Sequence, residues 1–284
     1  KFSLCNYWKK LLKMPDIDKN KNNQPIGVFD SGVGGLSVLR ELHSILPNEN
    51  FVFLADQKYV PYGEKIKEEL IELAYKITDY FIEKHNIKAM VVACNTSTCN
   101  SIAEVRKKYL LPVVGTAPAI KPAAELTKTK TVAVIATPST SASEVLKNLI
   151  KDYCQNINVL NIGCKNLEDE VEKGELDSPE DNELLLKYLK EVRDSDADYL
   201  VLGFLNYPFL KKSIQKIVGS NVTLIDSGNA IAKHTKSLLA NNFLENNQKK
   251  PGETLYFTTG DPAKFSKVSS ILLKNKIKAK KVKI

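Results

Sequence analysis

The sequence lacks any apolar run that approaches the roughly 18 residues needed to cross a bilayer. Its first residues, K-F-S-L-C-N-Y-W-K-K-L-L-K, also lack the long apolar stretch and the small-residue cleavage site of a secretory signal. We therefore expect a cytoplasmic protein that does not enter a membrane. Its 284 residues, 43% hydrophobic and 26% charged, suffice for two domains with sizeable cores.

Cysteine is scarce and its spacing forms no C-x-x-C pair. An odd number of cysteines without such a pair excludes a disulfide framework and a zinc knuckle. We therefore expect five free thiols and no metal site, at Cys5, Cys94, Cys99, Cys154 and Cys164.

Excess positive charge is absent from the body of the chain. The formal charge of the whole chain is +8, but residues 1–24 carry +4 and residues 264–284 carry +8, which leaves −4 for the residues between them. Terminal lysines of this kind usually keep chain ends solvated, and no face of interleaved aromatic and arginine residues is present. Nucleic acid is therefore not an expected partner. We expect residues 1–24 to form a flexible basic extension, with ordered structure from about Pro25.

From Pro25 onward, short apolar runs alternate with longer stretches of helical periodicity. This alternation is typical of βαβ units and predicts mainly parallel sheets with helices on both faces. The expected α/β architecture has two doubly wound domains facing each other across a cleft: residues 25–121 plus 230–284, and residues 122–229. Strands are expected at 26–30, 51–56, 89–94, 113–115, 132–137, 159–162, 199–203, 223–226 and 255–259.

The run A-M-V-V-A-C-N-T-S-T begins at residue 89 and ends a buried strand on a cysteine. Parallel sheets bind ligands beyond the carboxyl ends of their strands, where the N-terminus of the next helix favours a thiolate. Cys94 is therefore a candidate reactive thiol, and Asn95 and Thr96 are placed to hold a carboxylate. A structural buried cysteine is the alternative for any single Cys.

The glycine-rich run F-D-S-G-V-G-G-L-S (29–37) imitates a dinucleotide fingerprint. Ser37 stands where the third glycine belongs, and Asp30 would repel a pyrophosphate, so we expect no nucleotide cofactor. Asp30 is better placed to assist proton transfer, or simply to cap the next helix. The loop P-Y-G-E-K offers the Tyr62 hydroxyl and the Gly63 backbone to a ligand, although a plain turn would explain it equally well.

Several long motifs, in order, resemble the glutamate racemases of the aspartate/glutamate racemase superfamily: P-I-G-V-F-D-S-G-V-G-G-L-S-V, A-D-Q-K-Y-V-P-Y-G-E-K, A-C-N-T-S-T, P-V-V-G-T-A-P-A-I-K-P-A, L-I-D-S-G-N-A-I-A and F-T-T-G-D-P-A-K-F. The resemblance implies two flavodoxin-like domains, no cofactor, frequent homodimerisation and a role in supplying D-glutamate for peptidoglycan. It also implies a base on each face of the substrate, because the proton removed from one side is replaced from the other. Cys94 would be the base for the D-enantiomer, with Asp30 as its helper. The substrate-holding residues implied are Ser31, Tyr62, Gly63, Asn95 and Thr96.

The second cysteine motif of the family is altered. The family has G-C-T-H-Y-P, whereas this chain reads G-F-L-N-Y-P at 203–208. Phe204 replaces the second cysteine, Leu205 a threonine that would contact substrate, and Asn206 the histidine that assists that cysteine. Phe204 is also bulky enough to fill part of the cleft. Cys99 is expected to pack inside its helix, so we expect no second thiol base.

Three hypotheses follow. The chain is a racemase homologue, impaired or inactive, that still binds glutamate or a related dicarboxylic amino acid. Alternatively, it catalyses another reaction that needs only one cysteine. In the third hypothesis it is a regulatory partner of another protein and not an enzyme, because a fold alone does not determine function.

Overall fold

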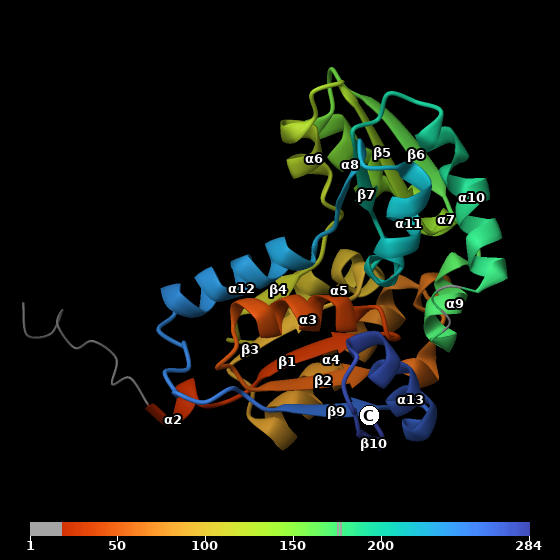
Figure 1. Ribbon diagram of the computed structural model, residues 1–284. Coiled ribbons are helices and arrows are strands. Elements are labelled where there is room, and N and C mark those ends of the chain that lie inside the picture. Colours follow the sequence, from red (N-terminus) through yellow and green to blue (C-terminus); the bar gives the residue numbers. More distant parts are fainter. Residues whose placement is uncertain (1–18, 175, 177) are drawn as a thin grey trace, which may run out of the picture.

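The computed structural model describes residues 19–174, 176 and 178–284. Within these residues the chain forms two separate β-sheets whose paired strands all run parallel. Figure 1 shows them in two lobes, the first sheet in the lower lobe and the second in the upper. The predicted α/β fold with mainly parallel sheets is confirmed, whereas the predicted domain limits stay a prediction.

The first sheet has the strand order β10-β9-β2-β1-β3-β4. Its central strands are buried at every position, because helices cover both faces of a parallel sheet. The strands are β1 (Ile26–Asp30), β2 (Phe51–Ala55), β3 (Ala89–Val92), β4 (Val113–Gly115), β9 (Thr254–Thr258) and β10 (Ala279–Lys281). The first lobe thus combines an early stretch of the chain with its C-terminal part.

Helices pack in pairs on this sheet, α3 against α12 and α4 against α5. The helices and 3₁₀ turns of the lobe are α3 (Gly35–Ile45), η1 (Gln57–Tyr59), η2 (Tyr62–Glu64), α4 (Lys67–His85), α5 (Asn95–Lys108), α12 (Gly228–Asn241) and α13 (Pro262–Leu273). Asn86 ends α4 in the left-handed conformation at φ 50°, which asparagine tolerates better than most residues.

The second sheet has the strand order β6-β5-β7-β8. Its strands are β5 (Thr131–Ala136), β6 (Asn158–Gly163), β7 (Tyr199–Leu202) and β8 (Thr223–Ile225). The helices and 3₁₀ turn of this lobe are α6 (Ile120–Leu126), α7 (Pro138–Ser141), α8 (Glu144–Tyr153), α9 (Leu167–Lys173), α10 (Pro179–Arg193), η3 (Tyr207–Leu210) and α11 (Lys211–Val218).

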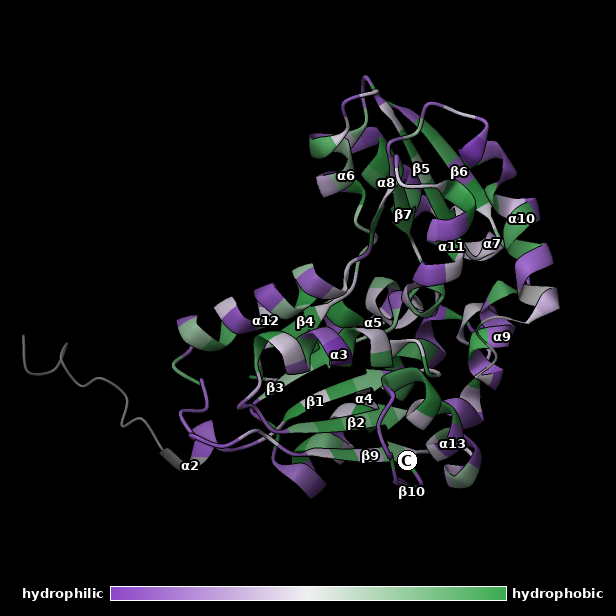
Figure 2. Ribbon diagram, in the orientation of Figure 1, coloured by the Kyte–Doolittle hydropathy of each residue, from purple (hydrophilic) through white to green (hydrophobic). Residues whose placement is uncertain are grey.

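Apolar packing connects the two lobes. In Figure 2 the strands of both sheets are largely hydrophobic. One buried cluster contains Val33 and Leu36 of the first lobe together with Leu205 and Tyr207 of the second. The lobes therefore share part of a hydrophobic core next to the loop that follows β1.

The described structure begins before Pro25. Helix α2 covers Lys19–Asn22, and the carbonyls of Asn22 and Asn23 accept hydrogen bonds from Lys88 Nζ and Asn50 Nδ2. The described structure therefore begins six residues before Pro25, where side chains of the first lobe bind this stretch of backbone, and the flexible extension stays a prediction. The rest of the predicted extension lies outside the described residues. Strand β10, with its sequence A-K-K, was not predicted.

Candidate active site

The order of strands in the first sheet makes the end of β1 a candidate ligand site. The chain passes from β1 to β2 on one side, while β3 pairs with β1 on the other. Such a reversal opens a crevice at the carboxyl ends of the two strands, where α/β proteins bind their ligands. Asp30 is the last residue of β1, and Cys94 precedes α5 just beyond β3.

Asp30 is tied to the loop that follows it. Its Oδ1 accepts the N–H of Ser31 at 2.7 Å, and its Oδ2 accepts the N–H of Gly35 at 2.7 Å. Burial raises the pKa of Asp30, although these backbone hydrogen bonds and one from Cys94 act against that rise. The alternative of a capping role is therefore compatible with the structure, but the same carboxyl also lies beside the thiol.

Cys94 is 5% exposed, and its Sγ lies 3.6 Å from Ser31 Oγ. Burial and the charge of Asp30 raise the pKa of Cys94 to about 12, although the N–H of Ser97 in the first turn of α5 lowers it. The helix N-terminus therefore has a smaller effect on this pKa than burial and Asp30 have, and at neutral pH the side chain is a thiol. It can donate a proton, or act as a base once Asp30 or solvent has taken that proton.

Asn95 links the two lobes. Its Nδ2 donates to the carbonyl of Gly203 at 3.2 Å, and its Oδ1 accepts from Thr116 Oγ1 at 2.6 Å. Both ends of the amide therefore have partners that a ligand would have to replace or share. Thr96 is half-buried in the first turn of α5, close to Cys94 in sequence.

The hydroxyl of Tyr62 is hydrogen-bonded to the buried carboxylate of Asp56. Its hydroxyl donates to Asp56 Oδ2 at 2.5 Å, and Asp56 Oδ1 accepts from Thr259 Oγ1 at 2.8 Å. Burial and Asp56 raise the pKa of Tyr62 far above its ordinary value, so the phenol stays protonated. Gly63 is exposed and faces the second lobe, since a Cβ built on it would lie 3.8 Å from Ser139 Oγ.

The three altered positions follow β7. Phe204 is half-buried, with its ring 5.6 Å from that of Tyr207 in an edge contact. Leu205 is buried, and its carbonyl accepts from Ser37 Oγ at 2.8 Å. Asn206 is buried too, with its Nδ2 3.4 Å from Glu172 Oε1. The altered segment therefore packs directly against the loop and helix that follow Asp30.

Sequence reasoning missed Glu172. This residue of α9 reaches across to the first lobe, where its Oε1 accepts the N–H of Val33 at 2.9 Å. It lies in the acidic run L-E-D-E-V-E-K, whose pattern is that of an ordinary solvated helix. Nothing local in that sequence distinguishes Glu172 from its neighbours. Sequence reasoning also missed the contact of Asp56 with Tyr62, because the two residues are brought together only by the fold.

The other described thiols lie apart from this constellation. Cys99 is exposed, so the expectation that it packs inside is wrong. The buried face of α5 is formed by Ser97, Ser101 and Val105, which turns Cys99 outward. Cys154 and Cys164 are buried in the second lobe, and Cys5 lies outside the described residues. Within the described part of the chain, no group of His, Cys, Asp and Glu residues is arranged to hold a metal ion.

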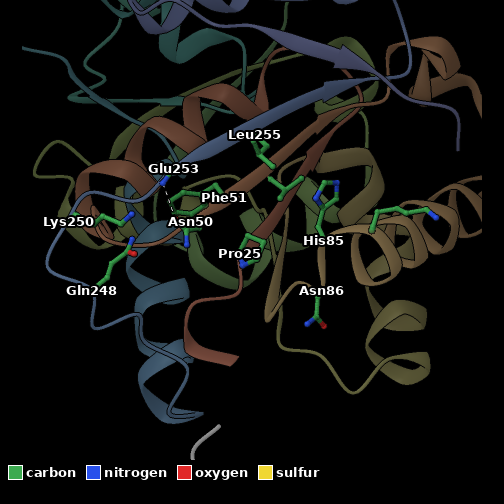
Figure 3. Close-up of a pocket in the computed structure, with 11 residues that line it drawn as sticks. Pro25, Asn50, Phe51, His85, Asn86, Gln248, Lys250, Glu253 and Leu255 are labelled. Atoms are coloured by element: carbon green, nitrogen blue, oxygen red, sulfur yellow. Dashed lines mark hydrogen bonds between the residues drawn. The ribbon is translucent and has the colours of Figure 1, made fainter. Parts of the chain in front are cut away.

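A cavity of about 500 Å³ lies elsewhere, at the amino ends of the strands (Figure 3). Pro25, Phe51 and Leu255 line it, and they stand at or near the beginnings of β1, β2 and β9. It is therefore a full strand length from Cys94 and is not part of the candidate active site.

The sequence profile of the Asp/Glu/Hydantoin racemases matches residues 26–235. The chain belongs to this family. One relative is the glutamate racemase of Herpetosiphon aurantiacus, which is 41% identical over 250 residues, 88% of this chain and 98% of the relative. The resemblance noted in the sequence is thereby confirmed.

Solved structures of racemases share the fold. The glutamate racemase of Francisella tularensis in complex with D-glutamate has a TM-score of 0.76 and 33% identity, over 92% of this chain and 98% of that one. The Escherichia coli glutamate racemase in complex with L-glutamate and the activator UDP-MurNAc-Ala has a TM-score of 0.80 and 29% identity, over 91% and 98%. No helix in the described part of this racemase-family chain has the length and apolar character to cross a bilayer.

Proposed function

We propose that this chain binds glutamate in the crevice between its lobes and is strongly impaired as a racemase. The observation that carries the proposal is the contrast between the two halves of the site. The Ser31 hydroxyl lies within hydrogen-bonding distance of both Asp30 and Cys94, whereas the position of the second base holds Phe204. The relatives from Herpetosiphon aurantiacus and Francisella tularensis, each aligned with this chain over 98% of its length, are glutamate racemases.

The chemistry needs one acid or base on each side of the α-carbon. Cys94 acts on one face, with Asp30 as the group that exchanges its proton. The hydroxyls of Ser31 and Tyr62, the backbone at Gly63, and Asn95 and Thr96 surround the amino acid. No residue of the segment Phe204–Asn206 has a titratable side chain, so a carbanion formed at the α-carbon regains its proton from the Cys94 side. The product then keeps its original configuration.

A cytoplasmic homodimer that serves cell-wall D-glutamate supply is the biological setting we propose. The alternative is a regulatory protein on a racemase fold. The hydrogen bonds of Leu205 and Asn206 support it, because they join the two lobes through residues that have no acid or base function.

The test measures racemisation of L-glutamate by circular dichroism. It compares the natural sequence with a triple variant that carries Phe204→Cys, Leu205→Thr and Asn206→His. General acid or base catalysis contributes roughly 10² to 10⁴ in rate, so we expect a gain of that order in the triple variant. Adding Cys94→Ala to the triple variant should abolish the gain. A natural protein that racemises as fast as the triple variant would contradict the proposal.

A further inference from the structure

Another cavity, of about 610 Å³, lies at the outer edge of the first sheet. It is bounded by residues at or just beyond the carboxyl ends of β2, β9 and β10, which are adjacent strands at one side of the sheet (Figure 1). The middle one of the three, β9, is three strand positions from β3, which is about 14 Å at the usual spacing. The cavity is therefore on the ligand-binding side of the sheet but apart from the crevice at Cys94.

The floor of this cavity is apolar. Its members, Tyr59, Val282 and Ile284, line the cavity and pack against a buried cluster of the first lobe. The backbone of the floor is fixed as well, because the N–H of Val282 donates to the carbonyl of Thr258 at 2.9 Å. A cavity of this volume on a fixed floor has the size of a small-molecule site.

The charged side chains that line the cavity are all lysines: Lys58, Lys281 and Lys283. Among the described residues, none of the three forms an ion pair. The carboxylates nearest to them in sequence are already engaged. Asp56 binds the hydroxyls of Tyr62 and Thr259, and Asp261 accepts the N–H groups of residues 263 and 264 at the start of α13. The cavity therefore presents positive charge that no carboxylate side chain pairs with.

The side chains of the cavity offer a ligand hydrogen-bond donors. Thr259 Oγ1 already donates to Asp56 and accepts the N–H of Lys58 at 3.0 Å. What is left is the three ammonium groups and the hydroxyl of Tyr59, which accepts from Lys58 Nζ at 3.4 Å and keeps its own hydrogen to donate. A ligand that carries negative charge and acceptor oxygens matches this set.

Lys58 is restrained before any ligand binds. Its N–H is bound by Thr259, and its ammonium lies 4.9 Å from the centre of the Tyr59 ring, within the range of a cation–π contact. A side chain that is already restrained loses less conformational freedom when it binds a ligand. Lys281 and Lys283 are two residues apart, so on extended backbone their side chains lie on the same face.

We propose that this cavity binds a phosphate ester, with the phosphate among the three ammonium groups and the organic part against the apolar floor. A phosphate monoester carries about two negative charges at pH 8 and has three strong acceptor oxygens. It can therefore engage several lysines at once, whereas a single carboxylate has two oxygens and one charge. The site belongs to the first lobe and does not depend on glutamate being the ligand of the crevice.

Isothermal titration of the full chain with phenyl phosphate and with inorganic phosphate, at about pH 8 and low salt, tests this proposal. We expect saturable binding of both, and tighter binding of phenyl phosphate because its ring covers the apolar floor. Lys281→Gln combined with Lys283→Gln should weaken both affinities by about tenfold or more, because charge-assisted hydrogen bonds are lost. Both lysines are exposed, so these substitutions leave the fold intact.

The matched control is the pair Lys84→Gln and Lys250→Gln at the cavity of Figure 3, which lowers the net charge by the same amount. This pair should leave both affinities unchanged. Asn95→Ala, which alters the crevice, should also keep phosphate binding.

Three results would overturn the proposal. Without saturable binding by the natural sequence there is no site, and an equal loss in the two lysine pairs would show a general effect of charge. Loss of binding in Asn95→Ala with full binding in the Lys281 and Lys283 variant would place the phosphate in the crevice. Phenyl phosphate that binds no more tightly than inorganic phosphate would overturn the assignment of an ester.

Discussion

The side-chain amide of Asn95 donates a hydrogen bond to the carbonyl oxygen of Gly203 across the two lobes. Asn95 directly follows Cys94, and Gly203 directly precedes Phe204. The Asn95 amide therefore connects the backbone next to Cys94, which is retained, with the backbone next to Phe204, which replaces the second cysteine. Any ligand that binds between them has to compete with this bond or use the same amide.

We expect Asn95→Ala to abolish saturable binding of glutamate, because it removes the amide that would hold the substrate and the bond that positions Gly203. Isothermal titration with D- and L-glutamate measures this directly. Asn100→Ala is the matched control, since its side chain donates to the carbonyl of Thr96 within α5. Equal binding by Asn95→Ala and the natural sequence would exclude Asn95 from the substrate site.

The glycine loop after β1 supplies a prediction about stability. A Cβ at Gly34 would meet Asn206 Oδ1 at 2.2 Å and the backbone of residues 205 and 206 at 3.2 Å. Because backbone cannot move aside as a side chain can, we expect Gly34→Ala to lower the free energy of unfolding by about 1–3 kcal/mol. Gly63→Ala meets only Ser139 Oγ at 3.8 Å and should change stability little. Urea denaturation of both variants tests this, and equal midpoints would show that the loop is free to shift.

The strands were predictable because short apolar runs alternate with stretches of helical periodicity, and two of these runs end at Asp30 and at Cys94. Asp30 and Cys94 could be placed at the carboxyl edge for that reason, and the structure brings them together. Strand β10 escaped prediction because A-K-K has no apolar run. It is held by its pairing with β9 and by the hydrogen bond from the N–H of Ala279 to Ser266 Oγ of α13. Glu172 and Asp56 escaped because their partners, Val33 and Tyr62, are set by tertiary packing.

The ionisation of Cys94 shows the same limit. A cysteine before a helix N-terminus suggests a lowered pKa, but burial and the charge of Asp30 raise the pKa of Cys94 instead. Neither the degree of burial nor the approach of Asp30 can be read from the residues next to Cys94.

A pH dependence follows from the pKa of Cys94, which burial raises to about 12. Below that pH the thiolate is the minor form, and its fraction rises about tenfold for each pH unit. We therefore expect the rate of α-proton exchange with D-glutamate to increase steeply between about pH 7 and about pH 9. A rate that is flat over this range would show that the thiolate is already formed, or that another group is the base.

The central claim is that one half of a two-base site remains active. Exchange of the α-proton in D₂O, with D-glutamate and L-glutamate offered separately, tests it most directly. Deuterium incorporation is followed by proton NMR, configuration by optical rotation, and Cys94→Ala provides the blank. We predict that D-glutamate alone incorporates deuterium and that neither enantiomer racemises. Exchange of both enantiomers with loss of optical rotation would contradict the account, because a second base would then have replaced the missing cysteine.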